Sequence, residues 1–123
     1  MKVCRGLRGA TKAECNTVEG IHGATREMLE HLIEANDIAE HDVAMAYFTV
    51  TPDLNAAFPA AAARQLGWTS TALMCATEIP VPDSLPSCIR VLILINTEKE
   101  PSELHNVYLK GTEVLLLHGF QPT

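Results

Sequence analysis

The sequence predicts an α/β (α+β) fold: a single domain with a mixed β-sheet and two main helices. Its length of 123 residues is typical of one domain. Apolar residues recur with a period of two in several segments and with a helical period in one long segment. The elements follow the order strand, helix, strand, helix and then three strands, which is typical of helices packed on a mixed sheet. We therefore expect residues 1–123 to form one domain.

The first half of the chain predicts a strand, a long helix and a second strand. Residues 2–9 alternate in the manner of a strand. Asn16 is the predicted N-cap of the long helix, with Glu19 as its capping-box partner, and the apolar stripe extends to about Ala35. Residues 43–50 end in β-branched and aromatic side chains, which favours a strand.

The second half predicts a short helix followed by strands. Residues 59–66 are rich in alanine, and Pro59 suits the first position of a helix. Residues 87–96 are apolar on both faces, which predicts a strand that is covered on both sides. The remaining predicted elements are a strand at 69–77, a helical turn within 101–107 and a final strand at 113–117.

Composition excludes several classes of function. Nine basic residues against 15 acidic ones give a net charge of −6, which disfavours binding to nucleic acid. No apolar run approaches the roughly 20 residues of a membrane-spanning helix, and no secretory leader is recognisable, so we expect a cytoplasmic protein without membrane contact. The four cysteines form no CxxC pair and have no histidine at ligand spacing. We expect free thiols, no metal and no cofactor.

Arg90 is the most unusual residue of the sequence, because it interrupts the apolar strand at 87–96. A buried guanidinium without an anionic partner is strongly unfavourable. Two interpretations remain open at this point. Arg90 forms a structural ion pair with Glu78 or another carboxylate, or it points into a site for an anionic ligand. Arg8, at the end of the first strand, is a second candidate for binding a small anion. Cys75 has no activating base nearby in sequence, so we expect a packing residue there.

Five short segments then occur in a fixed order and spacing. They are residues 5–11 (RGLRGAT), 51–54 (TPDL) with 58–60 (FPA), Cys75 with Glu78, 88–91 (CIRV) and 107–109 (VYL). With these segments the chain resembles the small monofunctional chorismate mutases of the trimeric, β-rich bacterial (Bacillus-type) class, over about residues 3–117. The resemblance implies a homotrimer whose sheets pack into a pseudo-barrel core, with active sites between neighbouring subunits. It also implies the Claisen rearrangement of chorismate to prephenate, without metal, cofactor or covalent intermediate.

The resemblance further implies catalytic roles for Arg90, Arg8 and Glu78. Arg90 matches the cation beside the ether oxygen of the breaking bond, so that function rather than a structural ion pair accounts for its position. Arg8 matches the arginine that holds a substrate carboxylate, and Glu78 with the region of Cys75 matches the groups that meet the substrate hydroxyl. The other implied substrate-binding residues are Tyr108 as a hydrogen-bonding residue, Phe58 and Arg64 from the adjacent subunit, and Leu73, Met74 and Leu115 as pocket wall.

Three features depart from that family's pattern. Ala61 stands where a lysine is frequent, Met74 replaces a smaller polar residue, and residues 118–123 match poorly. A different interpretation also remains open, in which a trimeric binding module holds a small carboxylated metabolite without changing it. In a third interpretation the protein has a purely structural or interaction role, and it would then show no affinity for small anions.

Overall fold

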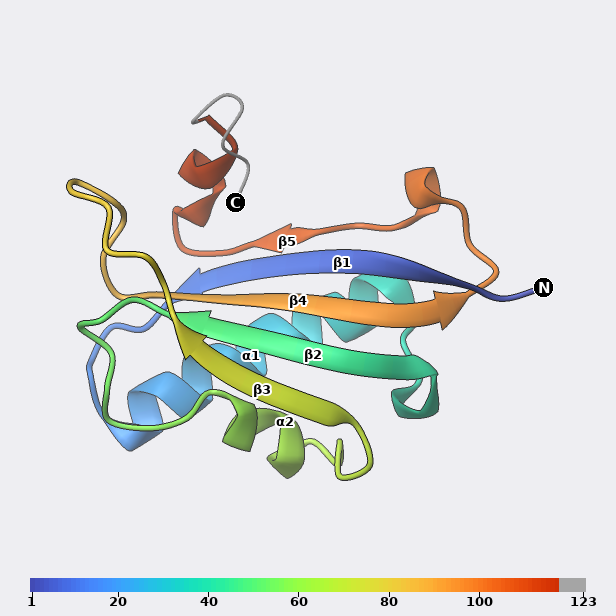
Figure 1. Cartoon of the computed structure of the whole chain (residues 1–123), viewed down its shortest axis with the longest axis horizontal. Coiled ribbons are helices and arrows are strands. Elements are labelled where there is room, and N and C mark those ends of the chain that lie inside the picture. Colours follow the sequence, from blue (N-terminus) through green and yellow to red (C-terminus); the bar gives the residue numbers. More distant parts are fainter. Residues whose placement is uncertain (118–123) are drawn as a thin grey trace.

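The computed structural model describes residues 1–117, and the side chains of residues 1–115. Five strands form one mixed sheet in the order β3-β2-β4-β1-β5, and two α-helices accompany it (Figure 1). This confirms the predicted α+β fold with a mixed sheet. The strands are β1 (Val3–Lys12), β2 (Val43–Val50), β3 (Ala72–Thr77), β4 (Cys88–Thr97) and β5 (Val107–Tyr108); the helices are α1 (Val18–Asn36) and α2 (Ala60–Gln65), with 3-10 turns at Glu40–Asp42, Pro101–Glu103 and Thr112–Leu117.

The pairing of β4 sets the geometry of the sheet. This strand is central and runs antiparallel to both β1 and β2, whereas β3 pairs parallel with β2, and β5 pairs parallel with β1. In this register Arg90 lies between Ala10 of β1 and Thr49 of β2. The register therefore places an arginine in the middle of the sheet, where a side chain is held by strands on both sides.

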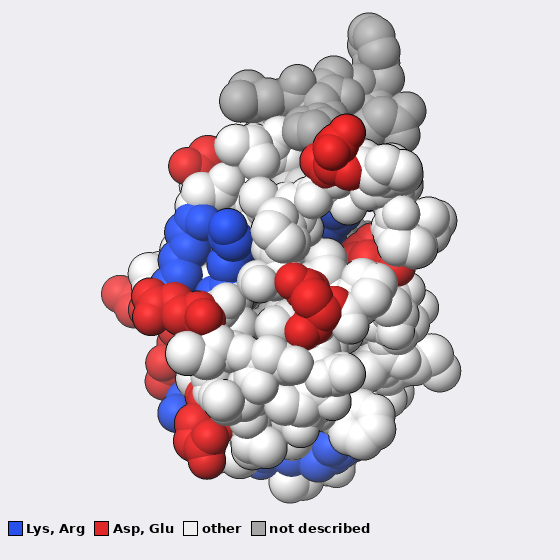
Figure 2. Space-filling model, turned by 90° about the vertical axis from the view of Figure 1, so that its left-hand side faces the viewer, with Lys and Arg blue, Asp and Glu red and all other residues white. Residues whose placement is uncertain are grey.

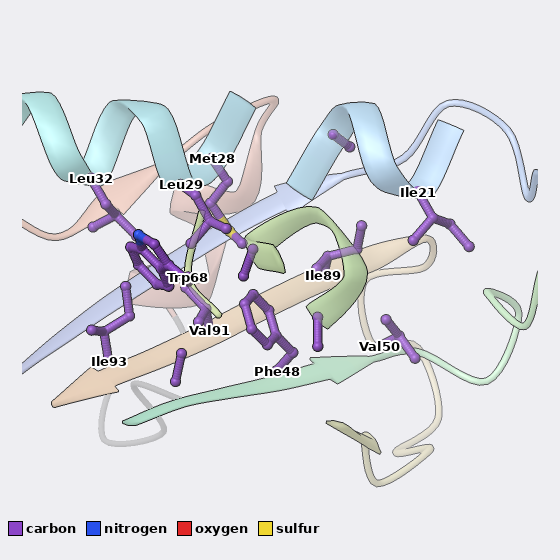
Figure 3. Close-up of a cluster of buried hydrophobic side chains, with 14 of the residues drawn as sticks. Ile21, Met28, Leu29, Leu32, Phe48, Val50, Trp68, Ile89, Val91 and Ile93 are labelled. Carbon is purple, nitrogen blue, oxygen red and sulfur yellow. The ribbon is translucent and has the colours of Figure 1, made fainter. Parts of the chain in front are cut away.

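The hydrophobic core lies between the sheet and the helices (Figure 3). Phe48, Ile89 and Ile93 point from the strands toward Met28 and Leu32 of α1, and all five side chains are fully buried. Each such side chain stabilises the fold by about 1.5–3 kcal/mol through removal of apolar surface from water. The core thus fixes the inner face of β4, and the alternate residues of the strand point the other way.

The outer face of the sheet is only partly covered within one chain. Leu92, on this face of β4, is 39% exposed, whereas Cys88 at the start of the strand is fully buried. Within one chain, β4 is therefore covered on both sides at its first residues and on one side at its middle. Both α-helices pack on the inner face, and among the described residues the outer face around Leu92 is covered only in part.

The start of α1 differs from the prediction by one residue. The N-cap is Thr17, whose hydroxyl accepts a hydrogen bond of 3.0 Å from the N–H of Gly20. Asn16 instead uses its side chain to hold a neighbouring loop, donating to Oδ1 of Asn55 at 2.8 Å and accepting from the Asn55 N–H at 3.0 Å. Both residue types make good caps, and the contact with Asn55 decides between them.

The C-terminal region differs more. A 3-10 turn at Pro101–Glu103 confirms the start of the predicted helical turn, but Val107–Tyr108 forms β5. The strand predicted at 113–117 is wrong, because these residues lie in the 3-10 helix Thr112–Leu117. The hydroxyl of Thr112 donates to the carbonyls of Leu109 at 2.7 Å and Ala10 at 3.2 Å, which turns the chain over the sheet instead of along its edge.

Two further observations complete the fold. The strand predicted from residue 69 begins at Ala72, because Gly67 with a φ of +98° and the hydrogen bond from Thr69 N–H to the Gly67 carbonyl form a turn first. Among residues 1–117, neither the 19-residue α1 nor a shorter helix combines the length and apolarity that a membrane crossing requires.

Candidate active site

A cleft opens on the outer face of the sheet, at the end where β1 finishes and β4 starts. Its volume is about 190 Å³. Its wall contains residues of β1, β2, β4 and β5 together with the 3-10 helix after β5, and the side chains important below are Arg8, Thr49, Glu78, Arg90, Tyr108 and Leu115. Figure 2 views the molecule from this end, where both basic and acidic side chains occur. Such a mixed surface does not suit a polyanion.

Arg90 and Glu78 form an ion pair at the wall of this cleft. Nε of Arg90 lies 3.6 Å from Oε2 of Glu78, and the two side chains are 24% and 23% exposed. Glu78 directly follows β3, and its N–H donates to the Val50 carbonyl at 2.8 Å, which ties the end of β3 to β2. Of the two interpretations that the residues left open, the ion pair of Arg90 with Glu78 is confirmed. Because both groups also line the cleft, the pair and the site are the same feature.

Thr49 is a further polar member of the site that the sequence analysis did not identify. Its hydroxyl donates a hydrogen bond to Oε2 of Glu78, the same oxygen that faces Arg90. Tyr47, two residues earlier on β2, also lines the cleft. The period of two in the strand at 43–50 already places Tyr47 and Thr49 on one face. The sequence did not predict that Thr49 pairs with Arg90 across β2 and β4.

Arg8 and Tyr108 enter the cleft from the β1–β5 side. The N–H of Arg8 donates to Oδ1 of Asn106 at 2.8 Å, and Tyr108 pairs with Ala10 across the two strands. The hydroxyl of Tyr108 is buried and has no hydrogen-bond partner among the described residues. A buried hydroxyl without a partner is unfavourable unless a ligand satisfies it. The cleft thus offers two arginines, one carboxylate and a phenol in the positions that the sequence analysis proposed.

Another group of predicted site residues lies outside this cleft. Phe58 and Cys75 line a separate depression beside the loop between β2 and α2, and Leu73 and Met74 line a third beside β2. Phe58 is 74% exposed and Met74 is 66% exposed. Arg64, in α2, is also exposed and lies in none of these three depressions. Within one chain the structure therefore joins Arg8, Glu78, Arg90, Tyr108 and Leu115, and it leaves the other five predicted residues on separate surfaces.

Comparison with known proteins identifies the family. The family described as chorismate mutase type I matches residues 4–116 of the chain. This protein belongs to the type I chorismate mutases.

Three relatives illustrate the similarity. The chain is 50% identical to the chorismate mutase AroH of Thermus thermophilus over 107 residues, which cover 86% of this chain and 88% of that protein. It is 40% identical to the chorismate mutase AroH of Bacillus subtilis (strain 168) over 112 residues, 90% of this chain and 88% of that protein. A chorismate mutase structure from Clostridium thermocellum superposes with a TM-score of 0.88 and 50% identity, over 90% of this chain and 99% of the other.

In this type I chorismate mutase, two of the three departures noted in the sequence lie outside the cleft. Ala61 is half-buried in α2, and Met74 projects from the edge strand β3. Residues 118–123, which match the family's pattern poorly, lie outside the described residues. Neither Ala61 nor Met74 lines the cleft that contains Arg8, Glu78, Arg90 and Tyr108.

The cysteines and other possible ligands contribute little chemistry to the site of this chorismate mutase. Burial raises the pKa of the Cys88 thiol, and the positive charge of Arg90 opposes part of that effect. The thiol is therefore protonated near neutral pH and is not a nucleophile. Cys75 is half-buried and packs against the main core, as expected of a packing residue. Within residues 1–115, no group of three or more His, Cys, Asp or Glu side chains could hold a metal ion.

Proposed function

We propose that this protein converts chorismate to prephenate by a Claisen rearrangement, and that the cleft on the outer face of the sheet supplies the catalytic groups. The observation that carries the proposal is the convergence of Arg8, Arg90, Glu78 and Tyr108 on one cleft in a member of the type I chorismate mutases. Two relatives at 50% and 40% identity are named as chorismate mutases, which supports the same reaction here.

The chemistry of the rearrangement suits these residue types. The reaction is unimolecular and transfers no proton, so it requires no acid–base pair. The substrate is a dianion that must be held in a compact shape, and fixed cations can do so at the expense of its free rotation. Among the described residues, the cleft wall carries the two arginines Arg8 and Arg90 and the carboxylate of Glu78, and arginines suit the carboxylates of a dianionic ligand. The cleft therefore binds and orients the substrate and stabilises charge in the transition state.

Arg90 is the proposed catalytic cation. Negative charge gathers on the ether oxygen as the C–O bond breaks ahead of C–C bond formation. A donor already fixed at that oxygen lowers the barrier selectively, typically by about 3–4 kcal/mol. Its position between β1 and β2 and its contact with Glu78 hold the guanidinium in place before substrate arrives. No reorganisation is then needed during the reaction.

The remaining groups are proposed to orient the substrate. Arg8 holds one carboxylate from the β1 side of the cleft, and the hydroxyl of Tyr108, which has no hydrogen-bond partner within the described part of the chain, donates to a carboxylate. The carboxylate of Glu78 accepts a hydrogen bond from the substrate hydroxyl, with the region of Cys75 close to it in the assembled site. Leu115, which is 8% exposed, supplies apolar wall.

We also propose a homotrimer in which each active site is shared by two subunits. The cleft volume of about 190 Å³ in one chain is smaller than the roughly 300–1,000 Å³ of typical small-molecule sites. Phe58 and Met74 are large, apolar and exposed, and Leu92 is partly exposed on the sheet. A neighbouring subunit that supplies Phe58, Arg64, Leu73, Met74 and Cys75 would close the cleft, and the outer faces of the sheets would form the trimer core.

Light scattering and hybrid trimers test this assembly. The protein should be a trimer at micromolar concentration, and a monomer would contradict the shared site. Arg90→Ala removes a group from the cleft, whereas Arg64→Ala removes a group that is proposed to reach the neighbour's cleft. Mixed trimers of the two inactive variants should regain activity, because some clefts then contain neither substitution. Mixtures that remain inactive would place both residues in the same subunit's site.

The activity itself is tested by the ultraviolet absorbance of chorismate. Purified protein should remove the absorbance with prephenate as the product. A folded trimer that binds chorismate and leaves it unchanged would be a binding module for a carboxylated metabolite.

We propose a cytoplasmic location, which the four free cysteines support because a reducing compartment keeps thiols unpaired.

A further inference from the structure

We propose that Thr49 is a positioning residue for the rearrangement: its hydroxyl fixes the Glu78 carboxylate, and through that carboxylate it fixes the Arg90 guanidinium at the wall of the cleft. This inference rests on the proposed function, because it assigns a part of the same site. Thr49 is not one of the residues that the resemblance to chorismate mutases implied.

The three side chains form a short chain of contacts. The Thr49 hydroxyl donates to Oε2 of Glu78, and the same oxygen lies 3.6 Å from Nε of Arg90. Thr49 and Arg90 are directly paired across β2 and β4, so their Cα atoms are held by the sheet itself. Thr49 is flanked on β2 by the buried Phe48 and Val50, which face the core and prevent the strand from rotating. The hydroxyl is therefore a rigid donor.

Glu78 is the member of this group that needs such a donor. It is the first residue beyond β3, an edge strand, and the next residue, Ile79, is 78% exposed. Its N–H is tied to the Val50 carbonyl, which places its Cα but leaves the torsions of a long side chain undetermined. A hydrogen bond from Thr49 to the charged carboxylate selects one position for Oε2, and bonds to ionised acceptors are the stronger ones.

The position of Oε2 in turn determines how Arg90 is held. The contact is made through Nε at 3.6 Å, which is an ion-pair distance and longer than a hydrogen bond. Without the Thr49 hydroxyl, Oε2 is free to move toward the guanidinium and make a closer, bidentate pair, as carboxylates and arginines commonly do. Such a pair would draw Arg90 out of alignment with the ether oxygen. Removing the hydroxyl would therefore weaken the stabilisation of the transition state, where Arg90 acts, more than it weakens substrate binding.

Thr49→Val tests this role, because valine keeps the shape and the branched Cβ of threonine and removes only the hydroxyl. We expect kcat to fall about tenfold to a hundredfold, the effect of losing one hydrogen bond to a charged group, with little change in KM. Thr49→Ser keeps the hydroxyl and should retain most of the wild-type kcat. Thr11→Val is the matched control, since Thr11 is buried in β1 and its hydroxyl has no hydrogen-bond partner among the described residues. It should leave kcat unchanged.

A double-mutant cycle distinguishes a positioning role from a structural one. If Thr49 acts through Glu78, Thr49→Val should cost little further activity in a Glu78→Ala background, measured at high enzyme concentration. An equal loss of kcat in both backgrounds would overturn the proposal, as would wild-type kcat in Thr49→Val or an equal loss in Thr49→Ser. Thermal unfolding of each variant confirms the fold, and Thr49→Ala replaces the valine variant if that one does not fold. Inactivity of the wild-type protein would instead contradict the proposed function.

Discussion

Gly9 lies at the closest approach between the sheet and α1, so Gly9→Ala is a sharp test of the packing described here. A Cβ at this position would lie 2.7 Å from Cδ1 of Leu32, 3.2 Å from Cγ1 of Val91 and 3.3 Å from Cγ of Met28. Carbon atoms in protein cores normally approach to about 3.5–4.0 Å, so Leu32 must move by roughly 0.8 Å. All three neighbours are buried within the core and have little room to move.

The size of the effect follows from two opposing terms. Overpacking a core by one methyl group costs about 1–3 kcal/mol. Replacement of glycine by alanine reduces the entropy of the unfolded chain and offsets about 0.4–1 kcal/mol of that cost. We therefore expect Gly9→Ala to lower the free energy of unfolding by about 1–2 kcal/mol, which corresponds to a fall in Tm of about 3–10 °C.

Urea unfolding at one fixed protein concentration measures the difference, because the stability of the proposed trimer would depend on concentration. Gly23→Ala is the control: it lies in α1, and no heavy atom lies within 4 Å of the added Cβ. Alanine has a higher helix propensity than glycine, so Gly23→Ala should raise the free energy of unfolding by up to about 1 kcal/mol. If Gly9→Ala were as stable as the wild type, or if both variants changed stability in the same direction, the close contact between β1 and α1 would be refuted.

Two further predictions concern titration and thiol chemistry. The hydrogen bond from Thr51 lowers the pKa of Asp53 more than burial raises it, so folding favours the charged carboxylate. The contribution of Asp53 to the free energy of unfolding is therefore present above the ordinary pKa of 3.8 and is lost as the pH falls below it. Asp53→Asn should therefore flatten the decline in stability between about pH 5 and pH 2, measured by urea unfolding, and an unchanged decline would contradict this. Cys4 and Cys15 are exposed and should react with Ellman's reagent in the folded protein, whereas Cys88, buried and with a raised pKa, should react only after unfolding. Fast labelling of Cys88 in the folded protein, detected by mass spectrometry, would contradict this prediction and show that the start of β4 opens.

The central strands were predictable because their signal is local. Residues 43–50 match β2 at both ends, and residues 87–96 match β4 within one residue. Both segments combine β-branched residues with regular alternation, and their inner faces fill the core. In such segments the local preference and the tertiary structure agree, so the sequence alone suffices.

The errors occur where a tertiary contact decides between two local preferences. Asn16 and Thr17 are both good N-caps, and only the bond between Asn16 and Asn55 selects Thr17. Residues 114–117 of the predicted strand 113–117 form a short apolar run, which suits a strand or a helix equally. The hydrogen bonds of Thr112 to the carbonyls of Ala10 and Leu109 turn this run into a 3-10 helix.

The candidate site was predictable only in part for the same reason. Arg90 was identified because a charge in an apolar strand requires a partner, but the residues alone left the choice between an ion pair and a site open. The structure shows the contact with Glu78 inside the cleft. Thr49 was missed because its importance depends on its pairing with Arg90 across two strands that are far apart in sequence. Phe58 and Arg64 lie outside the cleft of one chain, and the roles proposed for them depend on the proposed neighbouring subunit.

The most direct test of the account is the ratio of kcat for the wild-type protein and Arg90→Ala, measured from the loss of chorismate absorbance. If Arg90 stabilises the charge on the ether oxygen, kcat should fall by about a hundredfold to a thousandfold. Light scattering and thermal unfolding should show an unchanged assembly and fold. A folded Arg90→Ala protein with kcat within a few-fold of the wild type would contradict the assignment of Arg90 as the catalytic cation.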